Sequence, residues 1–255
     1  MKNVMWNKGG IVNHKFIRLR RTLIDCSTME SRRDGVMMYR PGRAWLRWIP
    51  KVLAWFAWFP WKGKALSAKD MATYECLKAL DGLQRQLGDF EYATIYLGNG
   101  STRSKFCIKV KLKGQVEQAE KYVILKMSNT EGGKAAIRQE CETLELLDKT
   151  DLRSQVPLLK GCGDLNGWKW SAQSCLPYGD SPNRLGKEHF DFLERLKHTG
   201  LCHGDFTPWN CTIVDGMLYV YDWESAGKWE KGKDEAWFKR QLKELLNIDL
   251  DEGKK

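Results

Sequence analysis

The dipeptide Asp215-Gly216 lies between two apolar runs, and this is the strongest short signal for a β-hairpin. With these two residues as the turn, facing positions on the two strands have numbers that sum to 431. Asn210 then faces Tyr221, the neighbour of Asp222. The hairpin therefore predicts that Asn210 and Asp222 lie roughly one strand spacing apart, about 5 Å.

Two oxygen-bearing side chains at the open end of a hairpin suit a hard cation such as Mg²⁺. Asp205 lies in the irregular loop just before this hairpin, within reach of the same opening. We therefore predict a magnesium site formed by Asn210 and Asp222, with Asp205 beside it.

Cys202, His203 and Cys211 in the same stretch allow two other interpretations. As zinc ligands they are poorly spaced, because two of them are adjacent and no fourth ligand is evident. As a nucleophile and its base, Cys202 and His203 are also poorly arranged, because neighbouring residues on an extended chain point apart. Both interpretations are therefore disfavoured.

Lys126 lies in the middle of a predicted strand over residues 121–127, with apolar neighbours on both sides. Residues 134–149 predict a helix whose apolar face includes Leu144 and also Glu140, whereas Glu142 points the opposite way. A carboxylate on an apolar face is costly unless it is paired. The periodicity thus predicts a Lys126–Glu140 ion pair, with a Glu140 at the rim of the helix as the alternative.

Further helices are predicted over residues 69–87, 187–197 and 234–246, and further strands over 91–97 and 105–110. The Gly-rich stretch over 156–178 predicts short strands and turns.

The motif His-Gly-Asp-Phe-Thr-Pro-Trp-Asn over 203–210, followed by Asp-Trp-Glu over 222–224, resembles the catalytic loop and metal-binding segment of the aminoglycoside phosphotransferase and choline kinase family. This family has a protein-kinase-like fold. The glycine-containing loop 97–104 falls at the family's phosphate-covering hairpin, and residues 173–177 fall at its interlobe hinge. Lys126 and Glu140 fall at its strand lysine and the helix partner of that lysine. The resemblance covers residues 90–228, a little over half of the chain.

The resemblance implies a role for each of these residues in an ATP- and Mg²⁺-dependent reaction. Asp205 would orient the attacking hydroxyl and accept its proton, while Asn210 and Asp222 would hold Mg²⁺ on the ATP phosphates. Lys126, fixed by Glu140, would bind the α- and β-phosphates. The remaining nucleotide contacts would come from Gly98, Asn99, Gly100 and Ser101 in the glycine loop and from Ser174 and Leu176 in the hinge. His203 is expected to anchor the loop rather than act as a base.

The implied fold class is α+β, a protein-kinase-like two-lobe fold with a small antiparallel-sheet N-lobe and a reduced helical C-lobe. Residues 1–64 would form a basic, Trp-rich N-terminal extension, residues 65–172 the N-lobe, and residues 173–255 the hinge and a short C-lobe with the catalytic loop and metal-binding hairpin. The family places a larger helical subdomain for its acceptor after the hinge. Residues 178–201 leave space for little more than one helix, so the sequence does not predict the identity of the acceptor.

The excess positive charge of the chain lies in its first quarter. Residues 1–64 carry 14 Lys and Arg against 3 Asp and Glu, within a chain of formal net charge +10. The segment also contains Trp45, Trp48, Trp55, Trp58 and Trp61 at roughly helical spacing. Three interpretations follow: a short helix that packs its indoles on the main domain, an anionic membrane surface, and, least favoured, single-stranded nucleic acid.

No apolar run reaches the ~18 residues of a spanning helix, and the basic N-terminus lacks the pattern of a secretory signal. The eight cysteines are scattered without a Cys-x-x-Cys pair, which favours a reducing compartment. We therefore expect a cytoplasmic location, or a peripheral one at the inner face of a membrane.

The leading functional prediction is a phosphotransferase that moves the γ-phosphoryl group of ATP to a hydroxyl of a small-molecule, glycan or lipid-linked acceptor. The alternatives are a kinase-like nucleotide-binding scaffold without turnover, and a basic membrane- or nucleic-acid-binding module.

Overall fold

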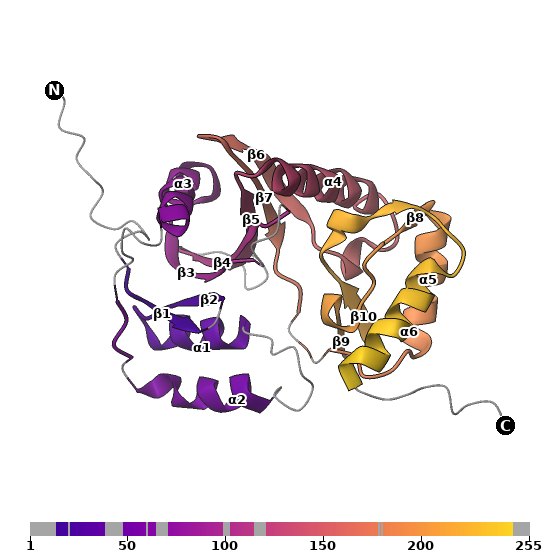
Figure 1. Ribbon diagram of the computed structural model, residues 1–255, viewed down its shortest axis with the longest axis horizontal. Helices are drawn as coiled ribbons and strands as arrows, with labels where there is room; N and C mark the ends of the chain where they lie inside the picture. Colours follow the sequence, from indigo (N-terminus) through magenta and orange to yellow (C-terminus); the bar gives the residue numbers. More distant parts are fainter. Residues whose placement is uncertain are drawn as a thin grey trace.

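The computed structural model describes residues 14–19, 21–38, 48–59, 61–64, 71–98, 103–114, 121–177, 179 and 181–246. The chain has a mixed α+β fold built on a seven-stranded antiparallel sheet, with two small two-stranded sheets beside it (Figure 1). The order in the large sheet is β1-β2-β3-β4-β5-β7-β6. Its strands are β1 (Phe16–Leu19), β2 (Thr22–Asp25), β3 (Phe90–Tyr96), β4 (Phe106–Leu112), β5 (Tyr122–Ser128), β6 (Leu159–Leu165) and β7 (Trp168–Ser174).

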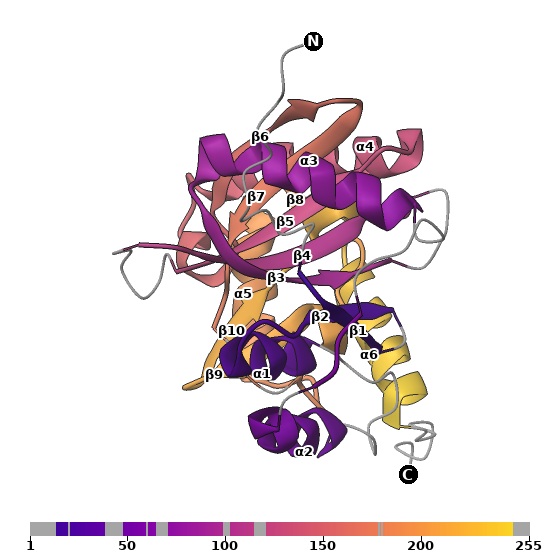
Figure 2. The same cartoon turned by 90° about the vertical axis from the view of Figure 1, so that its left-hand side faces the viewer.

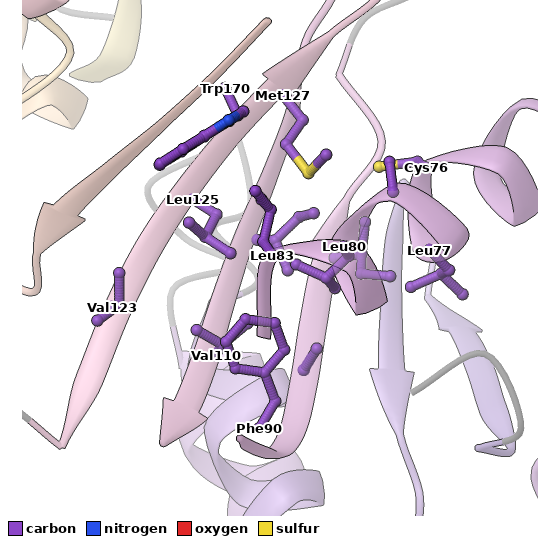
Figure 3. Packing of buried hydrophobic residues seen from close by; sticks show 14 of the residues in the cluster. Cys76, Leu77, Leu80, Leu83, Phe90, Val110, Val123, Leu125, Met127 and Trp170 are labelled. Carbon is purple, nitrogen blue, oxygen red and sulfur yellow. The ribbon is translucent and has the colours of Figure 1, made fainter. Parts of the chain in front are cut away.

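One face of the large sheet packs against helix α3 (Met71–Leu87). Alternate strand residues point toward this helix because side chains change face at every position of a strand. The resulting core joins one face of α3 to inward residues of β3, β4, β5 and β7, as Figure 3 shows. It includes Cys76, Leu77, Leu80, Leu83, Phe90, Val110, Val123, Leu125, Met127 and Trp170.

Helix α1 (Met29–Met38) lies on the opposite face of the sheet, and α2 (Trp48–Trp55) lies outside α1 (Figure 2). Polar contacts fasten α1 to the sheet. Glu30 forms ion pairs with Lys111 and, at 3.4 Å, with Lys121. Asp34 forms an ion pair with Lys109 at 3.3 Å. A short 3-10 helix, η3 (Phe56–Trp58), follows α2 directly.

A second hydrophobic core lies beyond the sheet, around helix α4 (Glu131–Leu147). Leu144 and Leu147 of α4 pack there with Phe192, Phe206 and Trp223. From α5 onward, this part of the chain is drawn in orange and yellow on the right of Figure 1. Its elements are η5 (Arg153–Gln155), α5 (Lys187–His198), β8 (Leu201–Cys202), η6 (Pro208–Asn210), β9 (Cys211–Val214), β10 (Met217–Val220), η7 (Trp223–Ser225), β11 (Gly227–Lys228) and α6 (Lys233–Leu246).

The structure confirms the predicted hairpin and its register. Strands β9 and β10 pair antiparallel with Val214 opposite Met217, so facing numbers sum to 431. Both turn residues, Asp215 and Gly216, have positive φ angles, as a tight Asp-Gly turn requires. One step beyond the ladder, the Tyr221 amide donates to the Asn210 carbonyl at 3.1 Å.

The main predicted elements are confirmed, with ends that differ by a few residues. Helix α4 begins at Glu131 rather than at residue 134, because the side chain of Thr130 caps it by accepting a hydrogen bond from the Gly133 amide. Strands β1 and β2 and helix α1 were not predicted from the sequence. These elements place part of the basic segment 1–64 within the large sheet and against it. No helix in the described part of the chain has the length and hydrophobicity needed to cross a bilayer.

Candidate functional site

A cavity of about 550 Å³ opens on the face of the sheet opposite α3. Strands β4 and β5 contribute Cys107, Lys109, Ile124 and Lys126 to its wall. The segment after β7 and the end of hairpin β9–β10 form other parts of the wall, so the cavity lies between the large sheet and the part of the chain that carries this hairpin. Its charged lining consists of Arg103, Lys105, Lys109 and Lys126 on the one hand and Asp34, Asp222 and Glu224 on the other.

Lys126 points into this cavity and binds Glu140 of α4, which confirms the predicted ion pair. The distance from Lys126 Nζ to Glu140 Oε1 is 2.5 Å, and both side chains are buried. The same Glu140 oxygen accepts a hydrogen bond from the Trp223 amide at 3.2 Å. Glu140 therefore ties strand β5 to the segment that follows hairpin β9–β10. The alternative of a Glu140 at the rim of the helix is wrong.

Asp222 completes a network of charges around Lys126. Its Oδ1 atom lies 2.7 Å from Lys126 Nζ and 2.9 Å from Lys105 Nζ, and Lys105 also pairs with Glu224. Asp222 adopts a left-handed conformation with φ 70°, which is uncommon outside glycine and is concentrated at functional sites. We name Lys105, Lys126, Glu140, Asp222 and Glu224 the ionic cluster.

The charges of the ionic cluster reinforce each other. Burial alone lowers the pKa of Lys126, but the negative charges of Asp222 and Glu140 outweigh it and raise the pKa above its ordinary value. Burial alone raises the pKa of Asp222, but Lys126 and Lys105 outweigh it and lower the pKa. Lysine and aspartate therefore both stay ionised at neutral pH, which keeps a cation on the cavity wall.

The loop over residues 203–210 is held by backbone hydrogen bonds to Asp234, near the start of α6. The two carboxylate oxygens of Asp234 accept from the amides of His203 at 2.7 Å and of Gly204 at 2.9 Å. Gly204 has φ 78°, and a Cβ at this position would lie 2.0 Å from the carbonyl oxygen of Ser225. Only glycine fits this close approach.

His203 anchors the loop, as the sequence predicted. Its ring is fully buried, with Nε2 at 3.1 Å from the Tyr221 carbonyl and Nδ1 accepting from the Asp205 amide at 3.2 Å. These partners assign the neutral tautomer with its proton on Nε2. Burial lowers the pKa of His203 despite the opposing charges of Asp234, Asp222 and Asp205.

Asp205 and Asn210 lie together at the end of the loop. The amide nitrogen of Asn210 donates to Oδ2 and to the backbone carbonyl of Asp205, each at 3.0 Å. Trp237 of α6 donates from Nε1 to Asp205 Oδ1 at 2.9 Å. Because the Asn210 nitrogen serves Asp205, its Oδ1 oxygen is the atom suited to a metal ion. We name His203, Gly204, Asp205, Asn210, Asp234 and Trp237 the loop cluster.

The structure brings the predicted site residues together as two groups. Lys126, Glu140 and Asp222 are in direct contact, and Asp205 contacts Asn210. Within the described chain no hydrogen bond joins Asp222 to either loop residue, and of the three only Asp222 lines the cavity. No set of three or more His, Cys, Asp or Glu side chains in the described residues could hold a metal ion. The convergence of all three on one ion thus stays a prediction.

The other predicted nucleotide contacts divide between described and undescribed residues. Gly98, Ser174 and Leu176 line the cavity. Gly98 has φ 70°, and a Cβ there would come within 2.6 Å of Ser104 Oγ. Asn99, Gly100 and Ser101 lie outside the described residues.

Several residues of the site were not predicted. Lys105 was assigned only to a strand, and Asp234 and Trp237 only to a helix. The three-residue spacing of Asp234 and Trp237 places both on one face of that helix, which is the one local signal that could have indicated a shared target. Helix α1 also contributes Asp34, Met37 and Met38 to the cavity wall, and nothing in the sequence pattern pointed to this.

The comparison with known proteins identifies no family: no protein-family model matches the chain, and no curated protein matches it.

Proposed function

We propose that the chain is an ATP- and Mg²⁺-dependent phosphotransferase that acts on a hydroxyl, with a protein-kinase-like arrangement of two lobes around the cavity. One observation carries this proposal. Lys126, a buried cation on a strand, is paired with Glu140 of the next helix and with Asp222, at the wall of a 550 Å³ cavity. In kinase sites a strand lysine that is paired with a helix glutamate binds the phosphates, and an aspartate binds the metal ion.

The arrangement of cores and segments supports the two-lobe interpretation. The sheet with α3 forms one hydrophobic core, and α5, α6 and hairpin β9–β10 belong to the other. Residues 174–177 connect β7 of the first part to the second part and line the cavity. A nucleotide base held beside this connection would place its phosphates toward Lys126.

The chemistry expected of the chain's own residues is mostly positioning and charge neutralisation. Lys126 and Lys105 would contact the phosphate oxygens. Asp222 and the Asn210 Oδ1 atom, which are hard oxygen donors, would hold Mg²⁺. When bound, Mg²⁺ neutralises charge on the phosphoryl group that is transferred. Asp205, oriented by Trp237 and Asn210, would accept the proton of the acceptor hydroxyl on a carboxylate oxygen.

The test combines nucleotide binding with turnover. We expect Mg·ATP to raise the melting temperature of the wild-type protein, and one member of an acceptor panel of sugars, lipid-linked sugars, choline-like amines and proteins to stimulate ADP release. Asp205→Asn should keep the thermal shift and lower turnover by about 10² to 10⁴. Unchanged turnover in this variant would refute Asp205 as the base.

Lys126→Met tests the cation of the cavity. We expect the thermal shift with Mg·ATP to fall sharply in this variant. Lys149→Met, which removes an exposed lysine just after α4, is the matched control and should respond to Mg·ATP as the wild type does. An equal shift in all three proteins would remove the strand lysine from the nucleotide site.

A nucleotide-binding scaffold without turnover is the second candidate. The observation that favours it is that Asp205 and Asn210 do not line the cavity, while Asp222 is paired with two lysines. This candidate predicts a thermal shift with Mg·ATP but no ADP release with any acceptor, and no change of either result in Asp205→Asn.

A further inference from the structure

Six large hydrophobic side chains are exposed on α2, on η3 and on the residue that follows. Trp55 and Trp58 are 71% and 73% exposed, and Phe59 is 63% exposed. Trp48, Val52 and Phe56 complete the set. We name these six side chains the aromatic face.

The interpretation in which the helix packs its indoles on the main domain is wrong for Trp48, Trp55 and Trp58. Segment 48–59 is nevertheless fixed to the molecule from its other side. Pro50 and Ala57 are buried, and the Arg32 Nε atom of α1 donates to the Ala57 carbonyl at 3.0 Å. The rings also order each other, with Trp55 and Phe56 in an edge-to-face contact at 5.2 Å. A held backbone with exposed rings is an arrangement suited to an external partner.

The aromatic face is concentrated rather than scattered. In the described residues 13 large hydrophobic side chains are exposed, and six of them lie within positions 48–59. The others are distributed over several elements, among them Phe190 on α5 and Trp229 after β11. Single exposed hydrophobics are normal, whereas a contiguous patch marks an interaction surface. Figures 1 and 2 both place α2 at the periphery of the molecule, outside α1.

The stretch of sequence that contains the aromatic face carries only positive charges. Between Asp34 and Asp70 the sequence has no acidic residue but seven basic ones: Arg40, Arg43, Arg47, Lys51, Lys62, Lys64 and Lys69. Lys51 is exposed between Trp48 and Trp55 on α2 itself.

We infer that the aromatic face docks on the headgroup region of an anionic lipid bilayer. Indole rings favour the boundary between water and lipid, and lysine or arginine beside them is attracted to anionic headgroups. Val52, Phe56 and Phe59 add apolar area that a lipid surface can bury. Single-stranded nucleic acid would instead need basic groups interleaved with the rings along a groove, and Lys51 is the single basic residue within segment 48–59.

This inference does not depend on the proposed function, but the two are linked by position. Helix α1 packs against α2 on one side and contributes Asp34, Met37 and Met38 to the cavity on another. The aromatic face and the cavity are therefore connected through a single helix, α1.

Flotation of the full chain with vesicles tests the inference. The vesicles are phosphatidylglycerol–phosphatidylcholine mixtures or phosphatidylcholine alone. We expect the wild type to float with the anionic vesicles, to float weakly with the neutral ones, and to be released by high salt. Trp55→Ser combined with Trp58→Ser should lower the bound fraction at least about tenfold. Trp229→Ser, at an exposed tryptophan elsewhere, is the matched control and should bind as the wild type does.

Two further measurements keep the result interpretable. Circular dichroism and thermal unfolding check that the double variant is folded. We expect it to fold because the two tryptophan side chains that are replaced are highly exposed. Tryptophan fluorescence of the wild type should shift to shorter wavelength with anionic vesicles, and the double variant should lose this shift. No binding of the wild type to anionic vesicles, or equal binding of the double variant, would overturn the inference. It would also be overturned if the same substitutions instead abolished a dimer or the binding of a single-stranded oligonucleotide.

Discussion

The ionic cluster and the loop cluster hold their polar groups by different means. In the ionic cluster, buried or partly buried side chains of opposite charge stabilise each other across β5, α4, the residue just before β4 and the segment after β10. In the loop cluster, backbone amides and neutral donors surround two carboxylates, Asp205 and Asp234. The stability of the ionic cluster therefore depends on the pairing of opposite charges, whereas that of the loop cluster depends on the backbone conformation. Substitutions should separate these two dependences.

The largest expected effect is the loss of a partner in the ionic cluster. Glu140→Ala would leave Lys126 buried beside Asp222 alone, and removal of one partner of a buried ion pair costs about 3–5 kcal/mol. Glu142→Ala, on the exposed side of the same helix, should change the free energy of unfolding by less than about 0.5 kcal/mol. Urea unfolding followed by circular dichroism measures both.

A double variant sharpens this result. Lys126→Met combined with Glu140→Gln removes both charges, so it should cost less than the sum of the single substitutions. Strict additivity would show that the pair is not energetically coupled.

Removal of the acceptor in the loop cluster should have the next largest effect. Asp234→Ala takes the hydrogen-bond acceptor from two backbone amides, those of His203 and Gly204, and each unsatisfied buried donor costs about 1–3 kcal/mol. Asp234→Asn keeps one acceptor oxygen and should recover part of the stability. The neighbour Glu235 is partly exposed and pairs with Lys239 on the same helix. Glu235→Ala is therefore the control, and a loss as large as that of Asp234→Ala would contradict this account.

Two glycines with nearly equal φ angles allow the cost of a close contact to be measured separately from the cost of the left-handed backbone conformation. Gly204 has φ 78° and Gly216 has φ 77°, but only at Gly204 does an added Cβ meet another atom, the Ser225 carbonyl oxygen at 2.0 Å. Alanine at either position incurs the left-handed cost of roughly 1–2 kcal/mol. Gly204→Ala should add about 1–3 kcal/mol for the close contact. Equal melting temperatures of the two variants would show that the loop can move away from Ser225.

The smallest expected effect is a pH dependence from His203. Burial lowers the pKa of this imidazole, so the folded chain keeps it neutral while the unfolded chain takes up a proton near pH 6.5. The contribution of His203 to folding stability should therefore be fully present above pH 6.5 and should decrease as the pH falls below this value. His203→Gln should flatten part of this slope in urea unfolding between pH 7.5 and 5.0. His198→Gln, at an exposed histidine on α5, should leave the slope unchanged.

Local patterns were sufficient to predict part of the site. The alternation of β5 placed Lys126 away from the α3 core, and the helical period of α4 placed Glu140 inward, so their pairing followed from two periodicities. The Asp215-Gly216 turn fixed the hairpin register because strand pairing propagates from a tight turn.

The contacts that were missed have no such local signal. Helix α1 approaches the sheet through Glu30 and Asp34, which meet Lys111, Tyr122 and Tyr92 rather than an apolar stripe. An amphipathic pattern is what sequence analysis detects, and α1 holds its place by charges and hydroxyls. Lys105 reaches Glu224 across 119 positions of the chain, a separation that periodicity cannot bridge.

The pairing of β2 with β3 has a consequence for how the protein can be shortened. Strand β2 covers residues 94–96 of β3, so removal of the first 64 residues would strip this stretch and leave its amides and carbonyls open. An exposed edge strand of this kind can pair with other chains and cause aggregation. Experiments on the basic segment therefore call for point substitutions within the full-length polypeptide, because the behaviour of a truncated protein would reflect aggregation and not the role of the segment.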